Sequence, residues 1–296
     1  MRSRPALVLL LAIVGISVAA PLIRLSSAHP VAIAVWRLVI SLGILGVGFA
    51  GTRGWRAWGS LSGRDVAIAL GAGAMLAIHF WSWNTSLLYT SIAASVILVN
   101  LQPALVAVLS SLWLRETPTR RQWTGIAIAI AGAAGVAFAS TPESAQPGSA
   151  PLRGNALALV GAIAAALYYL SGRRLRAKLD LVPYVSLVYG ACLVALLGIA
   201  LAVDAPLLPQ PRREWAIFAG LALGPMLLGH TGMNWALRHL PAYVVNIAVL
   251  GEPVGAILLA ALLPGIQEVP SMGVLAAGSV VILGILMALP RRELPS

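Results

Sequence analysis

Two stretches of this chain repeat the same arrangement of polar side chains inside otherwise apolar sequence. In each stretch an asparagine precedes a proline by 19 residues, and a polar or acidic residue stands immediately before that proline. Aligning the copies pairs Asn84 with Asn234, Gln102 with Glu252, and Pro103 with Pro253. Polar and ionisable groups in the middle of an apolar membrane span are costly and are functional candidates by default.

The chemistry open to these residues is the binding and release of a solute, with Glu252 able to carry a proton. Glu252 is the only acid deep within an expected span. Burial disfavours an ionised carboxylate, so protonation of Glu252 could be coupled to transport. A hydrogen-bonded Glu252 that fixes its helix is the alternative. Gln102 cannot titrate, so any coupling would be asymmetric. Pro103 and Pro253 break the backbone hydrogen-bond ladder, which suits gating and packing equally well.

Two histidines and two tryptophans extend the candidate site. At about 1.5 Å per residue, His79 falls in the outer half of its span and His230 falls about as far toward the inside. Each histidine is either a solute contact or a hydrogen-bonded core residue. Trp81 and Trp83 would offer stacking faces to a planar or cationic solute, although core packing is the ordinary role of such residues.

Three more side chains complete the candidate set. Ser95 shares a helix face with Gln102, so the two would form a partly polar cavity wall. Tyr168 lies deep in another apolar segment. Arg37 lies well below the outer surface. The preferred interpretation is that Arg37 snorkels to that surface or bonds to backbone carbonyls. The alternative is that it attracts a carboxylate.

The elements that must position these residues are membrane-spanning helices. Hydrophobic residues make up 59% of the 296 residues and charged residues only 10%, whereas soluble domains have about 25% charged residues. A helix needs about 20 mostly apolar residues to cross the hydrocarbon core. Ten such runs stand between turn signals, at 5–23, 30–49, 66–89, 91–113, 123–139, 154–171, 181–203, 214–237, 241–263 and 270–289. The sequence thus predicts an all-α integral membrane protein with ten transmembrane helices.

A polar segment divides these helices into two groups of five. Residues 140–153 are rich in proline and serine and are expected to be a linker. The linker separates a first five-helix unit at 1–139 from a second at 154–289, which is followed by a tail at 290–296. Because five is odd, the two units must insert in opposite orientations. The prediction is an inverted repeat, an arrangement that places one site between related halves.

The basic residues predict the orientation. With a cytoplasmic N-terminus, only four of the 20 Lys and Arg residues fall outside, namely Arg24, Arg153, Arg212 and Arg213, and Arg37 lies within a span. This positive-inside bias predicts that both termini are cytoplasmic. The net charge of +11 then reflects topology, and nucleic-acid binding is not expected because no exposed basic domain exists.

Several other classes lack their sequence signals. The chain contains no GxSxG, HExxH or Walker motif, and Cys192 is its single cysteine. No enzyme activity, cofactor, metal site or ATP-driven step is therefore expected. An enzyme acting on lipid and a channel-like facilitator remain alternatives.

Several motifs occur in a characteristic order along residues 5–289. They are His29-Pro30 with Trp36-Arg37, Asn84 to Pro103, Arg115-Glu116 with Gly125, Arg153-Gly154-Asn155, Arg173-Arg174, and Asn234 to Glu252-Pro253. In this order they resemble the drug/metabolite transporter superfamily, specifically its EamA type with ten helices in two repeats. The chain is most similar to the YddG-like branch of aromatic amino acid exporters.

The resemblance implies a carrier in the bacterial inner membrane that exports amino acids, most readily aromatic ones, or related amphipathic metabolites by alternating access. It also implies a central cavity enclosed by the first, third, fourth, sixth, eighth and ninth helices. Efflux of drugs or cations by the same fold is the alternative. The expected partners are a small-molecule substrate and membrane lipid. A monomer is the simpler expectation, because the two fused repeats supply both sides of the pathway.

Overall fold

The computed structural model describes residues 3–106, 109, 119–139, 150–176, 178–236, 239 and 249–288, and all regular structure within these ranges is helical. Six stretches there are long and apolar enough to cross a membrane: Leu7–Leu25, Pro30–Gly51, Gly63–Ser86, Pro151–Arg176, Leu181–Ala202 and Arg212–Ala236. Shorter apolar helices cover Ile92–Val106, Gly251–Leu262 and Met272–Ala288. The chain is therefore an all-helical, multi-pass membrane protein. Arg115, Glu116, most of the predicted linker and the tail lie outside the described residues.

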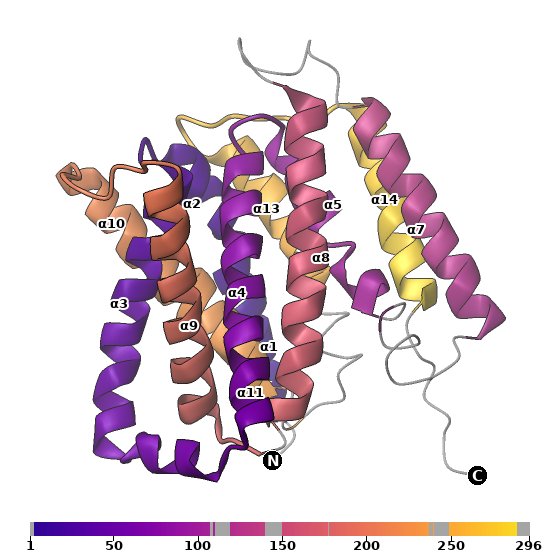
Figure 1. Cartoon of the computed structure of the whole chain (residues 1–296). Coiled ribbons are helices and arrows are strands. Elements are labelled where there is room, and N and C mark those ends of the chain that lie inside the picture. The colour runs from indigo at the N-terminus through magenta and orange to yellow at the C-terminus, as the bar shows by residue number, and fades with distance from the viewer. Residues whose placement is uncertain are drawn as a thin grey trace.

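Figure 1 shows the order and arrangement of the helices. In order they are α1 Ser3–Ser17, α2 Ala19–Leu25, α3 Pro30–Gly51, η1 Gly54–Ser60, α4 Gly63–Ser86, α5 Ile92–Val99, α7 Arg120–Ala139, α8 Pro151–Arg176, α9 Leu181–Ala202, α10 Arg212–Leu221, η3 Ala222–Thr231, α11 Gly232–Ala236, α13 Gly251–Leu262 and α14 Met272–Ala288. Most bounds lie within a few residues of the predicted spans.

The long helices pack side by side in one bundle. Figure 1 shows α3, α4, α8 and α9 running next to one another, with α4 packed against both α8 and α9. Helix α1 packs against η3, α11 and α13, so the start of the chain contacts its second half. Helices α7 and α14 form a pair at one edge of the bundle (Figure 1).

Local capping signals explain where two of these helices begin. Pro30 opens α3, and the backbone N–H of Val31 donates to His29 Nδ1 at 3.3 Å. Proline suits a first helical position, where its missing N–H costs nothing. Ser62 and Asp65 form a reciprocal capping box at the start of α4. Lys178 Nζ lies 2.6 Å from Asp65 Oδ2, so an ion pair joins the start of α4 to the α8–α9 connection.

Three predicted spans are interrupted. The first is two helices, because α1 ends at Ser17 and α2 begins at Ala19. Helix α5 ends at Val99, and the helix resumes after a turn, just before Pro103. Helix α13 begins only two residues before Pro253. Proline cannot donate to the preceding turn, so in both copies of the repeat it lies in the first turn of a new helical segment.

The predicted span at 214–237 is helical throughout but changes its winding. Between α10 and α11 the ten residues of η3 form a π-helix that contains Pro225. Thr231 Oγ1 donates to the carbonyl of Met226, five residues earlier, at 3.1 Å. Pro225 removes one backbone donor and crowds the carbonyl four residues before it. The π-turn relieves this conflict, and π-helical turns are frequently found at functional sites.

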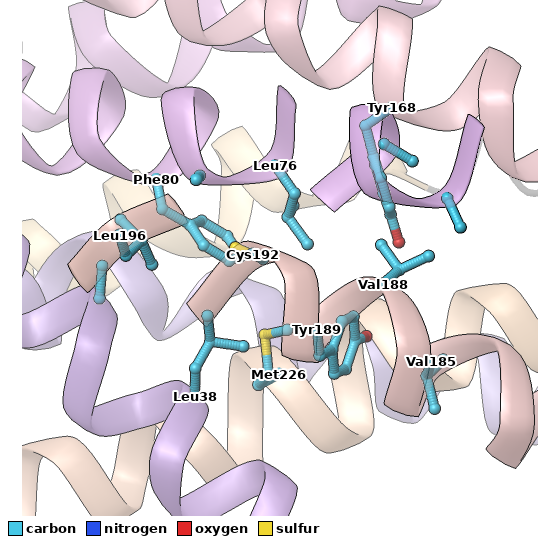
Figure 2. Packing of buried hydrophobic residues seen from close by; sticks show 14 of the residues in the cluster. Leu38, Leu76, Phe80, Tyr168, Val185, Val188, Tyr189, Cys192, Leu196 and Met226 are labelled. Carbon is cyan, nitrogen blue, oxygen red and sulfur yellow. The ribbon is translucent and has the colours of Figure 1, made fainter. Parts of the chain in front are cut away.

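The largest apolar core lies between α3, α4, α8, α9 and η3. Figure 2 shows Leu76 and Phe80 of α4 packed with Tyr189 and Cys192 of α9 and Met226 of η3. All five side chains are buried. Cys192 is thus a small buried core residue, as the sequence indicated.

The α7–α14 pair is packed through glycine. A Cβ atom at Gly125 would lie 2.6 Å from the carbonyl oxygen of Gly284, and a Cβ atom at Gly284 would lie 2.7 Å from that of Gly125. Such close backbone approach between membrane helices requires small residues. The last described helix of each half is therefore joined to the other by a dry seam, hereafter the α7–α14 seam.

Candidate functional site

A cavity opens between helices of the two halves of the chain. The empty space within it, including the open mouth, is about 570 Å³. The first half contributes Ile16, Ala19, Arg37, Leu76, His79, Trp83, Val99, Asn100 and Gln102. The second half contributes Ala165, Tyr168, Tyr169, Pro225, His230, Met233, Val249 and Glu252.

Many of the residues predicted from the sequence line this cavity together. They come from five different helices and from the interrupted segment after α5: Arg37, His79, Trp83, Gln102, Tyr168, His230 and Glu252. Polar groups that lie 150 or more residues apart in the chain therefore share one space. This arrangement can surround a solute with aromatic faces, hydrogen-bond donors and a carboxylate.

The aromatic wall of the cavity is built on α4. The rings of His79 and Trp83 stack with centroids 5.9 Å apart and planes 11° apart. His79 Nδ1 donates to the carbonyl of Gly161 on α8 at 2.9 Å, which fixes the orientation of the imidazole. His230 lies edge-on to His79 with ring centroids 6.4 Å apart. The two halves thus each contribute one histidine to the same region of the cavity.

Arg37 is fully buried and does not reach the outer surface. Its Cζ atom lies 3.4 Å from the centroid of the Phe80 ring, an aromatic contact on α4. None of its three guanidinium nitrogens has a hydrogen-bond partner in the described part of the chain. The preferred interpretation, snorkelling or bonding to carbonyls, is therefore not what the structure shows. Arg37 is instead one of the residues that line the cavity.

Glu252 faces the cavity from the first turn of α13. Asn100 Nδ2 donates to Glu252 Oε2 at 3.3 Å and to the carbonyl of Val96 at 2.8 Å. Asn100 ends α5, so this contact joins the two proline-interrupted helices of the repeat. Sequence reasoning did not predict this contact between Asn100 and Glu252.

Asn234 lies behind the lining and holds it in place. Its Nδ2 atom donates to the Tyr168 hydroxyl at 3.2 Å and to the carbonyl of His230 at 2.8 Å. Only 2% of Asn234 is exposed. The residue therefore positions two lining residues from within the bundle.

The remaining predicted residues do not line the cavity. Asn84 Nδ2 donates to the carbonyl of Pro30 at 3.1 Å, joining α4 to α3. The Ser95 and Ser86 hydroxyls share a hydrogen bond of 2.6 Å inside the protein. Trp81 packs against the core of Figure 2. Pro103 and Pro253 are buried at the helix starts described above.

Sequence reasoning also missed lining residues. Tyr169 adjoins Tyr168, with ring centroids 4.9 Å apart, and both line the cavity. Pro225 lines it from the π-helix. A proline in the middle of an apolar span was the available signal for an irregular helix at this point.

The cavity lining contains a basic and an acidic side chain, Arg37 and Glu252. In the described ranges, salt bridges join Arg24 to Glu268 and Asp65 to Arg174 and Lys178. Neither Arg37 nor Glu252 takes part in one. Those ranges also contain no group of three or more His, Cys, Asp or Glu side chains that could hold a metal ion.

A bundle of apolar helices around a polar, aromatic cavity is the architecture of a membrane transporter, and sequence comparison agrees. The EamA-like transporter family matches residues 4–138 and again residues 152–289. This chain belongs to that family and is a membrane transporter of the drug/metabolite transporter superfamily.

Two individual proteins are also similar to the chain. An uncharacterized transporter of Archaeoglobus fulgidus is 25% identical over 218 residues, which cover 71% of this chain and 72% of the relative. A solved crystal structure is 20% identical, with a TM-score of 0.64 over 97% of both chains. The latter similarity supports the fold alone.

Proposed function

We propose that this protein is a ten-helix carrier that exports amino acids, most readily aromatic ones, or related small metabolites across the bacterial inner membrane. The observation that carries the proposal is the cavity. Its walls come from α1 to α5 on one side and from α8, η3, α11 and α13 on the other. One family unit therefore supplies each side of a single site.

The proposed mechanism is alternating access by two inverted five-helix units. Related halves around one site can rock against each other and open it first to one side and then to the other. The helix interruptions before Pro103 and at the start of α13 lie beside the cavity and would serve as its moving parts. Because one chain supplies both walls, the mechanism requires only a monomer. In this proposal both termini lie in the cytoplasm, which the bias in the positions of Lys and Arg supports.

The proposed substrate class follows from the lining. Trp83, Tyr168 and Tyr169 offer rings against which a planar side chain can stack. Polar groups stand among these rings, so a ligand with one aromatic part and one polar part matches the wall. Efflux of an aromatic cation is the second candidate, since Glu252 and Trp83 could both attract positive charge.

Uptake into proteoliposomes tests the proposal. Purified protein would be assayed with labelled phenylalanine, tryptophan, threonine and a quaternary ammonium ion, with and without a pH gradient. We expect saturable uptake of the aromatic amino acids. Uptake that does not saturate would indicate a channel, and uptake of the quaternary ion alone would indicate cation efflux.

The chain offers a matched pair of control substitutions. Trp83 lines the cavity, whereas Trp81, two residues earlier on the same helix, packs against the core. We expect Trp83→Ala to weaken aromatic uptake more than Trp81→Ala does. Equal loss in the two variants, at equal amounts of folded protein, would contradict a role for this cavity in binding.

A further inference from the structure

Among the described residues, several buried hydrogen-bond donors of the cavity-lining side chains have no partner. They are Nε, Nη1 and Nη2 of Arg37, Nε1 of Trp83 and Nδ1 of His230, which is a donor in one of its tautomers. Arg37 is fully buried and Trp83 is 4% exposed. We call these three residues the donor cluster. A buried polar group without a partner is costly, so such groups collected in one cavity indicate a missing acceptor.

Contacts between neighbouring rings show that the donor cluster is continuous. The Arg37 guanidinium lies on the Phe80 ring, and the centroid of that ring is 5.6 Å from that of His230. His230 in turn neighbours His79, which stacks on Trp83. A ring face attracts a cation but offers no hydrogen-bond acceptor in the guanidinium plane. Phe80 therefore leaves the in-plane donors of Arg37 free for a ligand.

The same cavity contains acceptors that also lack full pairing. The Glu252 carboxylate receives only the amide of Asn100, at 3.3 Å, among the described residues. The amide oxygen Oδ1 of Asn100 has no partner. We call Glu252 and Asn100 the acceptor pair. Its charge is opposite to that of Arg37, yet the two charges form no salt bridge.

We infer that the cavity binds a zwitterion in a fixed orientation, with its carboxylate on the donor cluster and its ammonium group on the acceptor pair. A guanidinium presents two parallel N–H groups that match a carboxylate. A buried charge without a counter-charge is unfavourable, and a zwitterion supplies both missing counter-charges at once. This inference rests on the proposed function, because it takes the cavity to be the solute site.

The inference makes Arg37 and Glu252 specificity-determining residues with separate tasks. Arg37 recognises the carboxylate and rejects amines that lack one. Glu252 recognises the ammonium group and rejects simple carboxylic acids. A cationic drug would satisfy the acceptor pair but would leave the donor cluster unpaired, so it would bind weakly.

Binding of four related compounds tests the inference. Phenylalanine, phenylalanine amide, phenethylamine and 3-phenylpropanoate would be titrated by calorimetry into the full-length protein in lipid nanodiscs. For the wild type we expect removal of either charged group to weaken binding at least about 10-fold, because a buried polar site rejects ligands that leave it unpaired.

The substitutions separate the two tasks. With Arg37→Gln, phenylalanine and phenylalanine amide should bind about equally, whereas phenylalanine should still bind more tightly than 3-phenylpropanoate. Glu252→Gln should do the reverse. Arg37→Lys keeps the charge but loses the planar fork, so it should retain part of the preference. Arg56→Gln, at an exposed position outside the cavity, controls for the change in net charge.

Three outcomes would overturn the inference. Wild-type protein that binds phenethylamine as tightly as phenylalanine, or that binds no compound in the series, would exclude a zwitterion site. Variants that weaken all four ligands equally would show that Arg37 and Glu252 are only structural. If Arg37→Gln does not fold, the wild-type series and Arg37→Lys still decide. Selective binding without uptake in proteoliposomes would instead contradict the proposed transport function.

Discussion

The two halves of the chain contribute similar residues to the α7–α14 seam but different residues to the cavity. At the seam the contributions of the two halves are alike, because Gly125 and Gly284 each lie close to the other's backbone. At the cavity they are not, since Gln102 of one copy of the repeat corresponds to Glu252 of the other. Packing between helices can be satisfied symmetrically, whereas recognition of an asymmetric solute cannot.

The same asymmetry appears in the hydrogen bonds of the two copies. Asn84 and His79 bond to carbonyls of neighbouring helices, at Pro30 and Gly161. In the second copy, Asn234 bonds to the hydroxyl of the lining residue Tyr168, and His230 Nδ1 has no partner. Oδ1 of Asn84 also has no partner among the described residues, so the two copies use the same residue types for different contacts.

The largest effect is expected when the cavity is made symmetric. Glu252→Gln gives both copies the same side chain and removes the only carboxylate of the cavity lining. We expect kcat/KM for phenylalanine uptake to fall about 100-fold, as for loss of one member of a buried charged contact. Gln102→Glu in that background should not restore uptake, because Asn100 holds the acceptor site beside position 252. Restored uptake would contradict the asymmetry.

Leucine substitutions on the two sides of the α7–α14 seam should have similar effects on stability. We expect Gly125→Leu and Gly284→Leu to destabilise the protein by similar amounts, about 1–3 kcal/mol each, because each added side chain meets backbone of the facing helix. Thermal unfolding in detergent measures this effect. Gly43→Leu is the control, since no atom lies within 4 Å of a Cβ atom placed there. If Gly125→Leu and Gly284→Leu destabilise the protein by clearly different amounts, the two helices do not contribute equally to the seam.

The asparagines provide the smallest and most specific test. Asn234→Ala removes a bond to Tyr168 and should raise the KM for uptake about 5-fold, which corresponds to about 1 kcal/mol for one interhelical hydrogen bond. Asn84→Ala should lower stability by a similar amount without changing KM, because Asn84 joins α4 to α3 away from the cavity. A KM change of equal size in both variants would count against the division of roles.

The sequence predicted most helices because apolar length alone determines them. The predicted spans 30–49 and 181–203 agree closely with Pro30–Gly51 and Leu181–Ala202. The break at Val18 was missed although Pro21 signals it, because Pro21 has no N–H to donate to the carbonyl of Ser17, the last residue of α1. The π-helix was missed because its signal, Pro225, is equally compatible with a simple kink.

The candidate site was predictable where a polar residue is rare in its surroundings. Arg37, Glu252 and His79 stand out in apolar sequence, and all three line the cavity. Which face of a helix meets the cavity could not be predicted, because nearly every face of these helices is apolar. For that reason Trp81 and Trp83 looked alike in the sequence, although only Trp83 lines the cavity.

The central claim is that a solute binds in the cavity between the two halves. Ala165 lines the cavity, and Cys192, the single native cysteine, is buried. The variant Ala165→Cys with Cys192→Ala therefore carries one reporter thiol at the site, and Ser60→Cys in the same background carries one at the surface. The rate of maleimide labelling would be measured with increasing phenylalanine.

We predict that the labelling rate at position 165 falls as phenylalanine is added, in proportion to the fraction of protein without bound phenylalanine. The labelling rate at position 60 should not change. A rate at position 165 that does not change at saturating phenylalanine would contradict binding in this cavity.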